Sequence, residues 1–371
     1  MSSPTHAPRA ALLALVLLPG LAAAQDCLRL VEAFGPASWG KGQHQAAFPS
    51  PAPGSAAARW FLTVERQGPA TGRVKLNGQT RLRPEDLLGP RGELVRVEVP
   101  LQAHNALEIE VHGQGQLRVR VQGLVPAADL PLPAGRPVAE LTLYQRAFQV
   151  RQPCGWETVM VPVPASDGLF TLRLARSAPP PVLGLLRWNG GFPLGPLPLR
   201  PGHAVAEGPV RVQALNALAV RLVGVRGARA QVTLSGFVVD EAPPEIAWTA
   251  PAPGATVTAA DPLRVAFSDA LSGLRPGSLR VLLDGSSDVT AAFQVSAGEA
   301  TSTAGALGVL PAGTHTLVAS VQDRACNASL ATVSFLVGGA PDVTPPVITT
   351  PGDLVVEQTV LLAETLAALS A

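Results

Sequence analysis

The 371-residue chain has 28 basic and 27 acidic residues, and its net charge of +1 gives no electrostatic basis for binding nucleic acid or an anionic membrane surface. Length alone predicts roughly two to four domains. With 36 glycines, 37 prolines and short alternating apolar stretches between them, the composition favours many short strands joined by turns over helices.

The N-terminal residues have the pattern of a secretory signal peptide. Arg9 supplies a positive charge, Ala10 to Leu18 form a short apolar core, and Ala22-Ala23-Ala24 offer a small-residue cleavage site. We therefore expect residues 1–24 to be removed and the mature protein to be secreted or held at the cell surface. No later segment reaches the ~18–20 apolar residues of a membrane-spanning helix, so no membrane span is expected.

Three cysteines, Cys27, Cys154 and Cys326, lie far apart in the sequence. In an exported chain an odd number permits at most one internal disulfide and leaves one thiol over. Their separation favours three unpaired thiols. No pair of cysteines and no cysteine–histidine cluster has the spacing of a zinc site.

A duplicated pattern of asparagines organises the first two thirds of the chain. Asn77, followed by glycine, precedes Asn105 by 28 positions, and Asn189, also followed by glycine, precedes Asn216 by 27 positions. Each Asn-Gly pair suits a tight hairpin turn between two strands. The near-constant spacing predicts two copies of one β unit.

The two copies are expected at residues 25–125 and 137–240. The segment between them, residues 126–137, is rich in proline and alanine and is interpreted as a short, semi-stiff linker. Each copy has ~100 residues, which is enough to bury a core of its own.

Strand-like stretches in both copies alternate between apolar and polar residues. In the stretch from Leu107 to Val111 the apolar residues would face a core and the intervening glutamates would face water. Arg118 and Arg120 are expected to face water in the same way. Burial on one face is typical of antiparallel sheets packed as a sandwich, so the expected fold is all-β, with tandem β-sandwich modules of jelly-roll or immunoglobulin-like type.

A third unit is expected at residues 243–338, after Pro243-Pro244. Its alternating stretches, spaced about 8–12 residues apart, fit an immunoglobulin-like sandwich of roughly seven strands. His315 lies in one of these strands and is expected to point to solvent.

The third unit resembles the bacterial immunoglobulin-like repeats of large surface and adhesin-type proteins. The residues that carry the resemblance include Pro243-Pro244-Glu245-Ile246, Phe267-Ser268-Asp269, Leu283-Asp284-Gly285 and Asp323-Arg324-Ala325-Cys326-Asn327. The family usually has glycine where Cys326 stands. Glycine adopts a positive φ readily and cysteine does not, so this departure bears on the backbone angle of the turn. The resemblance implies an immunoglobulin-like fold and a role in adhesion.

The flanking segments carry weaker resemblances. Thr344-Pro345-Pro346-Val347-Ile348 and Pro351-Gly352-Asp353-Leu354 look like the opening of a hyaline-repeat (HYR) module, which residues 342–371 are too short to complete. The two leading copies resemble uncharacterised β-sandwich modules of exported bacterial proteins. The Leu-Asn-Gly at Leu76 to Gly78 also occurs in galactose-binding-like jelly rolls.

The sequence offers few candidates for chemistry. It lacks the motifs G-x-S-x-G, H-E-x-x-H and GxxxxGK[ST], so no enzyme activity is expected. Asp269, Asp284 and Asp323 lie in expected turns at strand ends, where they either cap their own turns or together bind Ca²⁺ weakly between modules. Trp39 and Trp156, in corresponding loops, are candidates for stacking on sugars.

The sequence therefore predicts an exported, non-enzymatic, modular β-sandwich protein that acts in cell-surface adhesion or as an extracellular spacer. Its expected partners are surface glycans or other cell-surface proteins, with no nucleic acid, and no cofactor beyond a weak structural Ca²⁺ is expected. Two alternatives remain open: a pair of carbohydrate-binding modules, and the stalk portion of a longer secreted enzyme or toxin.

Overall fold

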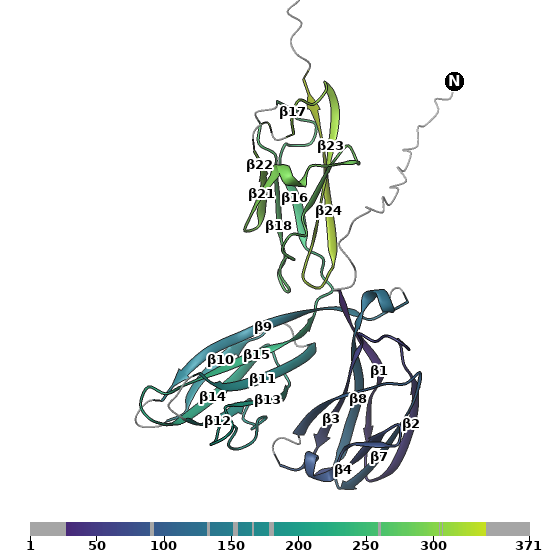
Figure 1. The fold of residues 1–371 in the computed structure, drawn as a ribbon, viewed down its shortest axis with the longest axis vertical. Helices are drawn as coiled ribbons and strands as arrows, with labels where there is room; N and C mark the ends of the chain where they lie inside the picture. The colour runs from purple at the N-terminus through teal and green to yellow at the C-terminus, as the bar shows by residue number, and fades with distance from the viewer. Residues whose placement is uncertain are drawn as a thin grey trace, which may run out of the picture.

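The computed structural model describes residues 27–338, except for residues 90–92, 132–133, 151–154, 165–166, 178–181, 259–260, 304 and 306. The expected signal peptide, Cys154 and the HYR-like segment lie outside the described residues. The described chain is nearly all β-structure arranged in three units (Figure 1). No helix within it has the length and apolar character needed to cross a membrane.

The first unit is a sandwich of two antiparallel sheets. Its elements are β1 (Leu28–Trp39), β2 (Gly42–Pro49), β3 (Arg59–Gln67), β4 (Ala70–Leu76), β5 (Gln79–Leu82), the 3-10 helix η2 (Pro84–Leu87), β6 (Leu94–Val99), β7 (His104–Gly113), β8 (Gln116–Pro126) and the 3-10 helix η4 (Ala127–Asp129). One sheet has the strand order β1-β8-β3-β6 and the other β2-β7-β4-β5, the arrangement of an eight-stranded jelly roll. Alternating residues such as Leu62, Leu107 and Val119 are fully buried between the sheets.

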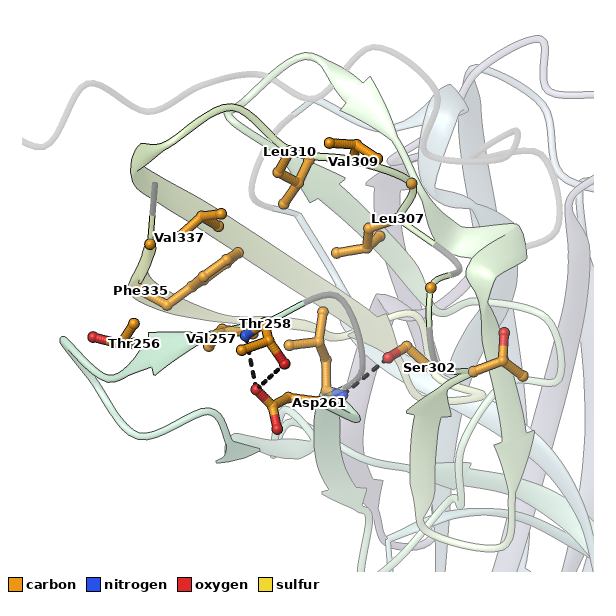
Figure 2. Close-up of a pocket in the computed structure, with 15 residues that line it drawn as sticks. Thr256, Val257, Thr258, Asp261, Ser302, Leu307, Val309, Leu310, Phe335 and Val337 are labelled. Carbon is orange, nitrogen blue, oxygen red and sulfur yellow. Dashed lines mark hydrogen bonds between the residues drawn. The ribbon is translucent and has the colours of Figure 1, made fainter. Parts of the chain in front are cut away.

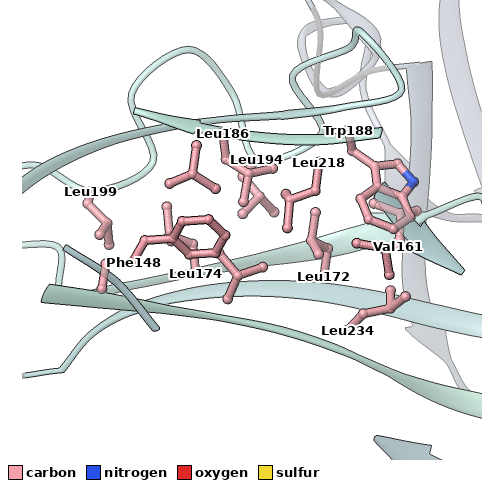
Figure 3. Close-up of a cluster of buried hydrophobic side chains, with 14 of the residues drawn as sticks. Phe148, Val161, Leu172, Leu174, Leu186, Trp188, Leu194, Leu199, Leu218 and Leu234 are labelled. Atoms are coloured by element: carbon pink, nitrogen blue, oxygen red, sulfur yellow. The ribbon is translucent and has the colours of Figure 1, made fainter. Parts of the chain in front are cut away.

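The second unit repeats this arrangement strand by strand. Its strands are β9 (Arg136–Gln149), β10 (Glu157–Pro162), β11 (Gly168–Arg176), β12 (Val182–Trp188), β13 (Val205–Val210), β14 (Leu215–Gly224) and β15 (Arg229–Val239). The order β9-β15-β11-β13 matches β1-β8-β3-β6, and β10-β14-β12 matches β2-β7-β4. Leucines from both sheets meet Phe148 and Trp188 in its core (Figure 3).

The third unit is an immunoglobulin-like sandwich. It consists of β16 (Glu245–Ala250), β17 (Thr256–Val257), β18 (Arg264–Ser268), β19 (Arg280–Leu283), β20 (Ser287–Asp288), the 3-10 helix η5 (Thr290–Ala292), β21 (Phe293–Ser296), β22 (Glu299–Ser302), β23 (Gly313–Gln322) and β24 (Ala328–Val337). The sheet β16-β18-β22-β21 faces β17-β24-β23-β19-β20, with β17 parallel to β24. The expected all-β fold of tandem sandwiches is confirmed.

The two jelly rolls share a sheet, so more than a linker joins them. β1 pairs with β9 in antiparallel register from Leu28–Val138 to Leu30–Arg136, which merges the two inner sheets into one of eight strands. A small apolar cluster that includes Leu124 and Leu169 covers this seam. The outermost strands, β6 and β13, also contact each other, so the sheet curls around a cleft between the two lobes. Figure 1 shows the two lobes spreading from their shared strands.

The repeated asparagines fasten each turn to the neighbouring strand. Asn77 and Asn189 begin their turns with φ of 54° and 51°, a left-handed conformation that asparagine tolerates. Asn77 Nδ2 donates to Asn105 Oδ1 at 2.9 Å, and the Ala106 N–H donates to Asn77 Oδ1 at 2.9 Å. The second unit repeats both bonds with Asn189 and Asn216, at 3.0 and 2.8 Å. The asparagine pairs are structural clamps.

The expectation that His315 points to solvent is wrong. His315 is 8% exposed, because it shares the core-facing parity of β23 with Leu317, Ala319 and Val321. Its imidazole is accommodated by two polar partners, Asp284 Oδ2 at 2.8 Å and the Pro311 carbonyl at 2.9 Å. A polar residue in an alternating strand is therefore no guide to exposure when the strand's register puts it on the core face.

Candidate functional site

The three units meet at a joint beside the start of β1, and a disulfide closes it. Cys27 and Cys326 are bonded across a sequence separation of 299 residues, so the expectation of three unpaired thiols is wrong. Cys326 has a φ of 67°, the left-handed conformation that glycine adopts readily. The turn thus holds Cys326 in a left-handed conformation from which its side chain reaches the first unit.

Polar and apolar contacts hold the second and third units together at the same joint. The Asn327 side-chain amide donates to the carbonyls of Asp240 and Ala242 at 2.8 and 3.3 Å. The Ser272 N–H donates to Asp240 Oδ2 at 3.0 Å, and Leu271 packs against the core of the second unit. The segment around Pro243-Pro244 is therefore bracketed by contacts on both sides.

Three carboxylates gather at this joint. Asp240, Asp269 and Asp323 place one oxygen each within 4.8 Å of the others, and clustered carboxylate oxygens are the ligands that Ca²⁺ prefers. The structure thus brings together two of the aspartates expected from the sequence, Asp269 and Asp323. It adds Asp240, which the sequence reasoning missed because this residue belongs to the preceding unit, directly after β15.

The same carboxylates also cap their own turns. Asp269 Oδ1 accepts hydrogen bonds from the N–H groups of Leu271 and Gly273, and Asp323 Oδ1 accepts one from the Asn327 N–H at 2.8 Å. Burial is the main cause that raises the pKa of Asp323, and the nearby Asp240 and Asp269 carboxylates add to it, although Asn327's hydrogen bonds lower it. A proton or a cation would relieve this repulsion.

Asp284 lies apart from the cluster. It starts the turn after β19 with a φ of 50° and bonds His315. That hydrogen bond and a second from the Thr316 N–H lower the pKa of Asp284. The Pro311 carbonyl and the Asp284 carboxylate in turn raise the pKa of His315. Asp284 is therefore half of a polar pair within the third unit.

Each candidate tryptophan is partly buried and has a ring face in contact with a neighbour. The Trp39 ring stacks on Phe34 with centroids 5.8 Å apart and planes nearly parallel. The Arg187 guanidinium lies 4.8 Å from the centroid of Trp156 and 4.9 Å from that of Phe192. By contrast, Trp60 and Trp188 are buried in the cores of their units.

Two hollows stand out among the described residues. At the end of the third unit away from the joint, an apolar hollow of about 350 Å³ lies between Leu307, Leu310, Phe335 and Val337 (Figure 2). The second is the cleft between the jelly rolls, about 700 Å³, which charged and polar side chains line together with apolar ones such as Leu30 and Phe170.

Comparison with known proteins places the chain in no family. No protein-family model matches it, and no curated protein matches its sequence. Among solved structures, the major capsid protein P2 of bacteriophage PM2 is 12% identical, with a TM-score of 0.21 over 58% of this chain and 98% of that protein.

Two further structures are similarly distant. A structure of a 1.5-MDa bacterial ice-binding adhesin is 14% identical, with a TM-score of 0.15, covering 80% of this chain and 91% of that one. Dimeric latent PorU from Porphyromonas gingivalis is 15% identical, with a TM-score of 0.16, covering 67% of this chain and 30% of that one. Scores this low carry no argument about function.

Proposed function

We propose that this is an exported, non-catalytic protein of cell surfaces that holds a two-lobed head on an immunoglobulin-like unit, for adhesion or as a spacer. The observation that carries the proposal is the joint, where one disulfide ties the first strand of the head to the third unit. Disulfides persist in oxidising compartments, which supports export.

The arrangement of the units suits presentation of the head. The two jelly rolls spread from the joint on one side, and β24 runs from the joint to the far end of the third unit (Figure 1). The continuous sheet across β1 and β9 fixes the lobes to each other. Surfaces at the tips of the lobes would thus be held at a set distance from whatever the far end of the third unit adjoins.

A pair of carbohydrate-binding modules centred on Trp39 and Trp156 has less support. Stacking on a sugar needs an open ring face, whereas Phe34 covers part of Trp39 and Arg187 lies over Trp156. No observation favours the stalk of a longer enzyme or toxin over a surface protein, so neither alternative replaces the proposal.

The test is binding of the labelled mature chain to whole cells and to a panel of surface glycans, with and without Ca²⁺. Saturable binding to cells is expected. If the aspartate cluster binds Ca²⁺, binding should respond to chelation in the wild type and not in Asp240→Asn, with Asp129→Asn as a matched control outside the cluster. Absence of binding to cells and glycans, together with turnover of any substrate by the purified chain, would refute the proposal.

A further inference from the structure

The cleft between the jelly rolls is enclosed by the outer face of the shared sheet. Strands β1, β3, β6 and β8 of the first unit line one wall, and β11 and the end of β13 line the other. The walls are tied across the cleft: Arg96 Nη1 donates to the Phe170 carbonyl at 3.2 Å, and Arg211 forms an ion pair with Glu65. At about 700 Å³ the cleft has the size of a small-ligand site.

The lining carries an excess of positive charge. It contains Arg96, Arg118, Arg120, Arg136 and Arg211 against Glu32, Glu65 and Asp167. Arg120 Nε is 3.5 Å from Glu32 Oε1, and Arg136 Nη1 is 3.1 Å from Asp167 Oδ2. Arg211 is paired with Glu65, so three of the five arginines already have carboxylate partners. No carboxylate forms an ion pair with Arg96 among the described residues.

Arg96 and its neighbours form a row across three adjacent strands. Thr63 on β3 pairs with Arg96 on β6 on one side and with Arg120 on β8 on the other. Directly opposed residues have side chains about 5 Å apart on the same face of a sheet. The Arg96 and Arg120 side chains therefore start on either side of Thr63 on the wall of the cleft.

Two polar atoms in this row lack partners. Arg96 Nε and Thr63 Oγ1 are both buried, and neither has a hydrogen-bond partner within the described chain. A buried donor left without a partner destabilises the fold, and more so when it carries a charge. Burial alone lowers the pKa of Arg96 to about 10, which still leaves the guanidinium charged at neutral pH. Arg96 thus has a buried donor and a positive charge with no carboxylate partner, and the Thr63 hydroxyl beside it is also unpaired.

We propose that the cleft binds an acidic saccharide, with its carboxylate or sulfate held by the Arg96–Thr63–Arg120 row. An anionic oxygen can accept from the unpaired Arg96 Nε–H and Thr63 hydroxyl, and a guanidinium matches the planar oxygens of such groups. Glu32, Glu65 and Gln122 beside the row can accept from or donate to sugar hydroxyls. An acidic peptide fits less well, because most of the cleft wall consists of strands paired on both sides within the sheet, which leaves little free edge for a peptide strand to join.

This inference does not rest on the adhesin or spacer function, because it concerns only the two jelly rolls. Isothermal titration calorimetry of the mature chain with tri-galacturonic acid, its methyl ester and a chondroitin sulfate oligosaccharide tests it. At least one acidic probe should bind, more weakly as salt is raised, and the neutral ester should bind at least tenfold more weakly. The two acidic arms distinguish carboxylate from sulfate.

Variants locate the site. Arg96→Gln should weaken binding roughly ten- to a hundredfold, the loss expected for a hydrogen bond to a charged group. Thr63→Val should weaken it by a smaller factor without removing charge. Arg264→Gln, which removes an exposed arginine from the third unit, should leave it unchanged.

Circular dichroism and the unfolding temperature establish that each variant is folded. Failure of both acidic probes to bind the wild type would overturn the proposal. So would equal binding of the ester, or unchanged binding in folded Arg96→Gln and Thr63→Val.

Discussion

At the scale of single residues, the asparagine clamps show how one side chain fixes a junction between two strands. Asn216 is fully buried, accepts hydrogen bonds from Asn189 Nδ2 and the Gln213 N–H, and donates to the Gln213 carbonyl. Asn105 does the same in the first unit. Because no shorter or apolar side chain can serve all of these groups, the asparagines recur at nearly the same spacing.

Asn216→Ala should therefore lower the free energy of unfolding of the second unit by about 2–3 kcal/mol, since it leaves buried partners unsatisfied. Calorimetry of the mature chain measures the loss as a downward shift of one transition. The control is Gln114→Ala at the exposed turn before β8, where a change within about 0.5 kcal/mol is expected. A loss in Asn216→Ala no larger than in the control would contradict the clamp.

A second repeated residue pair went unnoticed in the sequence. Gly123 lies opposite Trp60 on the neighbouring strand, and a Cβ at Gly123 would come within 2.4 Å of the indole. Gly236 lies opposite Phe170 in the same way, with a Cβ contact of 2.8 Å to the ring. Each glycine makes room for the aromatic side chain of its partner strand, a reason that only the strand register reveals.

At the scale of elements, the periodicity and the Asn-Gly turns were enough to predict an all-β fold of tandem sandwiches, but they left the jelly-roll and immunoglobulin-like types open for the first two units and put Trp39 in a loop, whereas it ends β1. Contacts between distant strands could not be predicted, because alternation shows which residues share a face but not what that face meets. Arg118 and Arg120 alternate as water-facing residues should, yet they line a cleft that exists because β6 and β13 meet. Asp240 likewise lies beside Asp269 and Asp323 because the second unit meets the third there, and alternation does not reveal such a contact.

The element β23 gives the third unit a dependence on pH. The folded pKa of His315 is raised above its usual 6.5, so its contribution to stability is fully present below pH 6.5 and is lost as pH rises through the folded value. The pKa of Asp284 is lowered below its usual 3.8, so its contribution is present above that pH and is lost on further acidification. The pair therefore stabilises the unit most between about pH 4 and 6.5.

We expect the third unit to unfold at a higher temperature near pH 5.5 than near pH 8, and the difference to vanish in His315→Gln. Calorimetry at the two pH values measures it, and proton NMR of the imidazole would locate the raised pKa directly. Exposed His203 provides the control variant His203→Gln, which should keep the wild-type difference. An equal pH dependence in His315→Gln would assign the effect to other groups.

At the scale of the whole molecule, the disulfide decides how tension would pass through the chain. Because Cys27 is bonded to Cys326, a pull between the N-terminal side of Cys27 and the far end of β24 crosses the bridge and bypasses both jelly rolls. Only the residues after Cys326 lie on the force path, and β24 is held there by β23. The head is then shielded from force, whereas the third unit takes it.

Single-molecule stretching with handles at the two ends of the mature chain tests this path. The oxidised protein should never release the chain between Cys27 and Cys326, which are 299 positions apart, whereas the reduced protein should release it. At roughly 3.5 Å per extended residue, the hidden length is about 1,000 Å. Cys326→Ser should release it without a reductant, and Cys154→Ser should not. Release of the full length by the oxidised wild type would show that the bridge does not carry the load. It would also show that the head is not shielded from force.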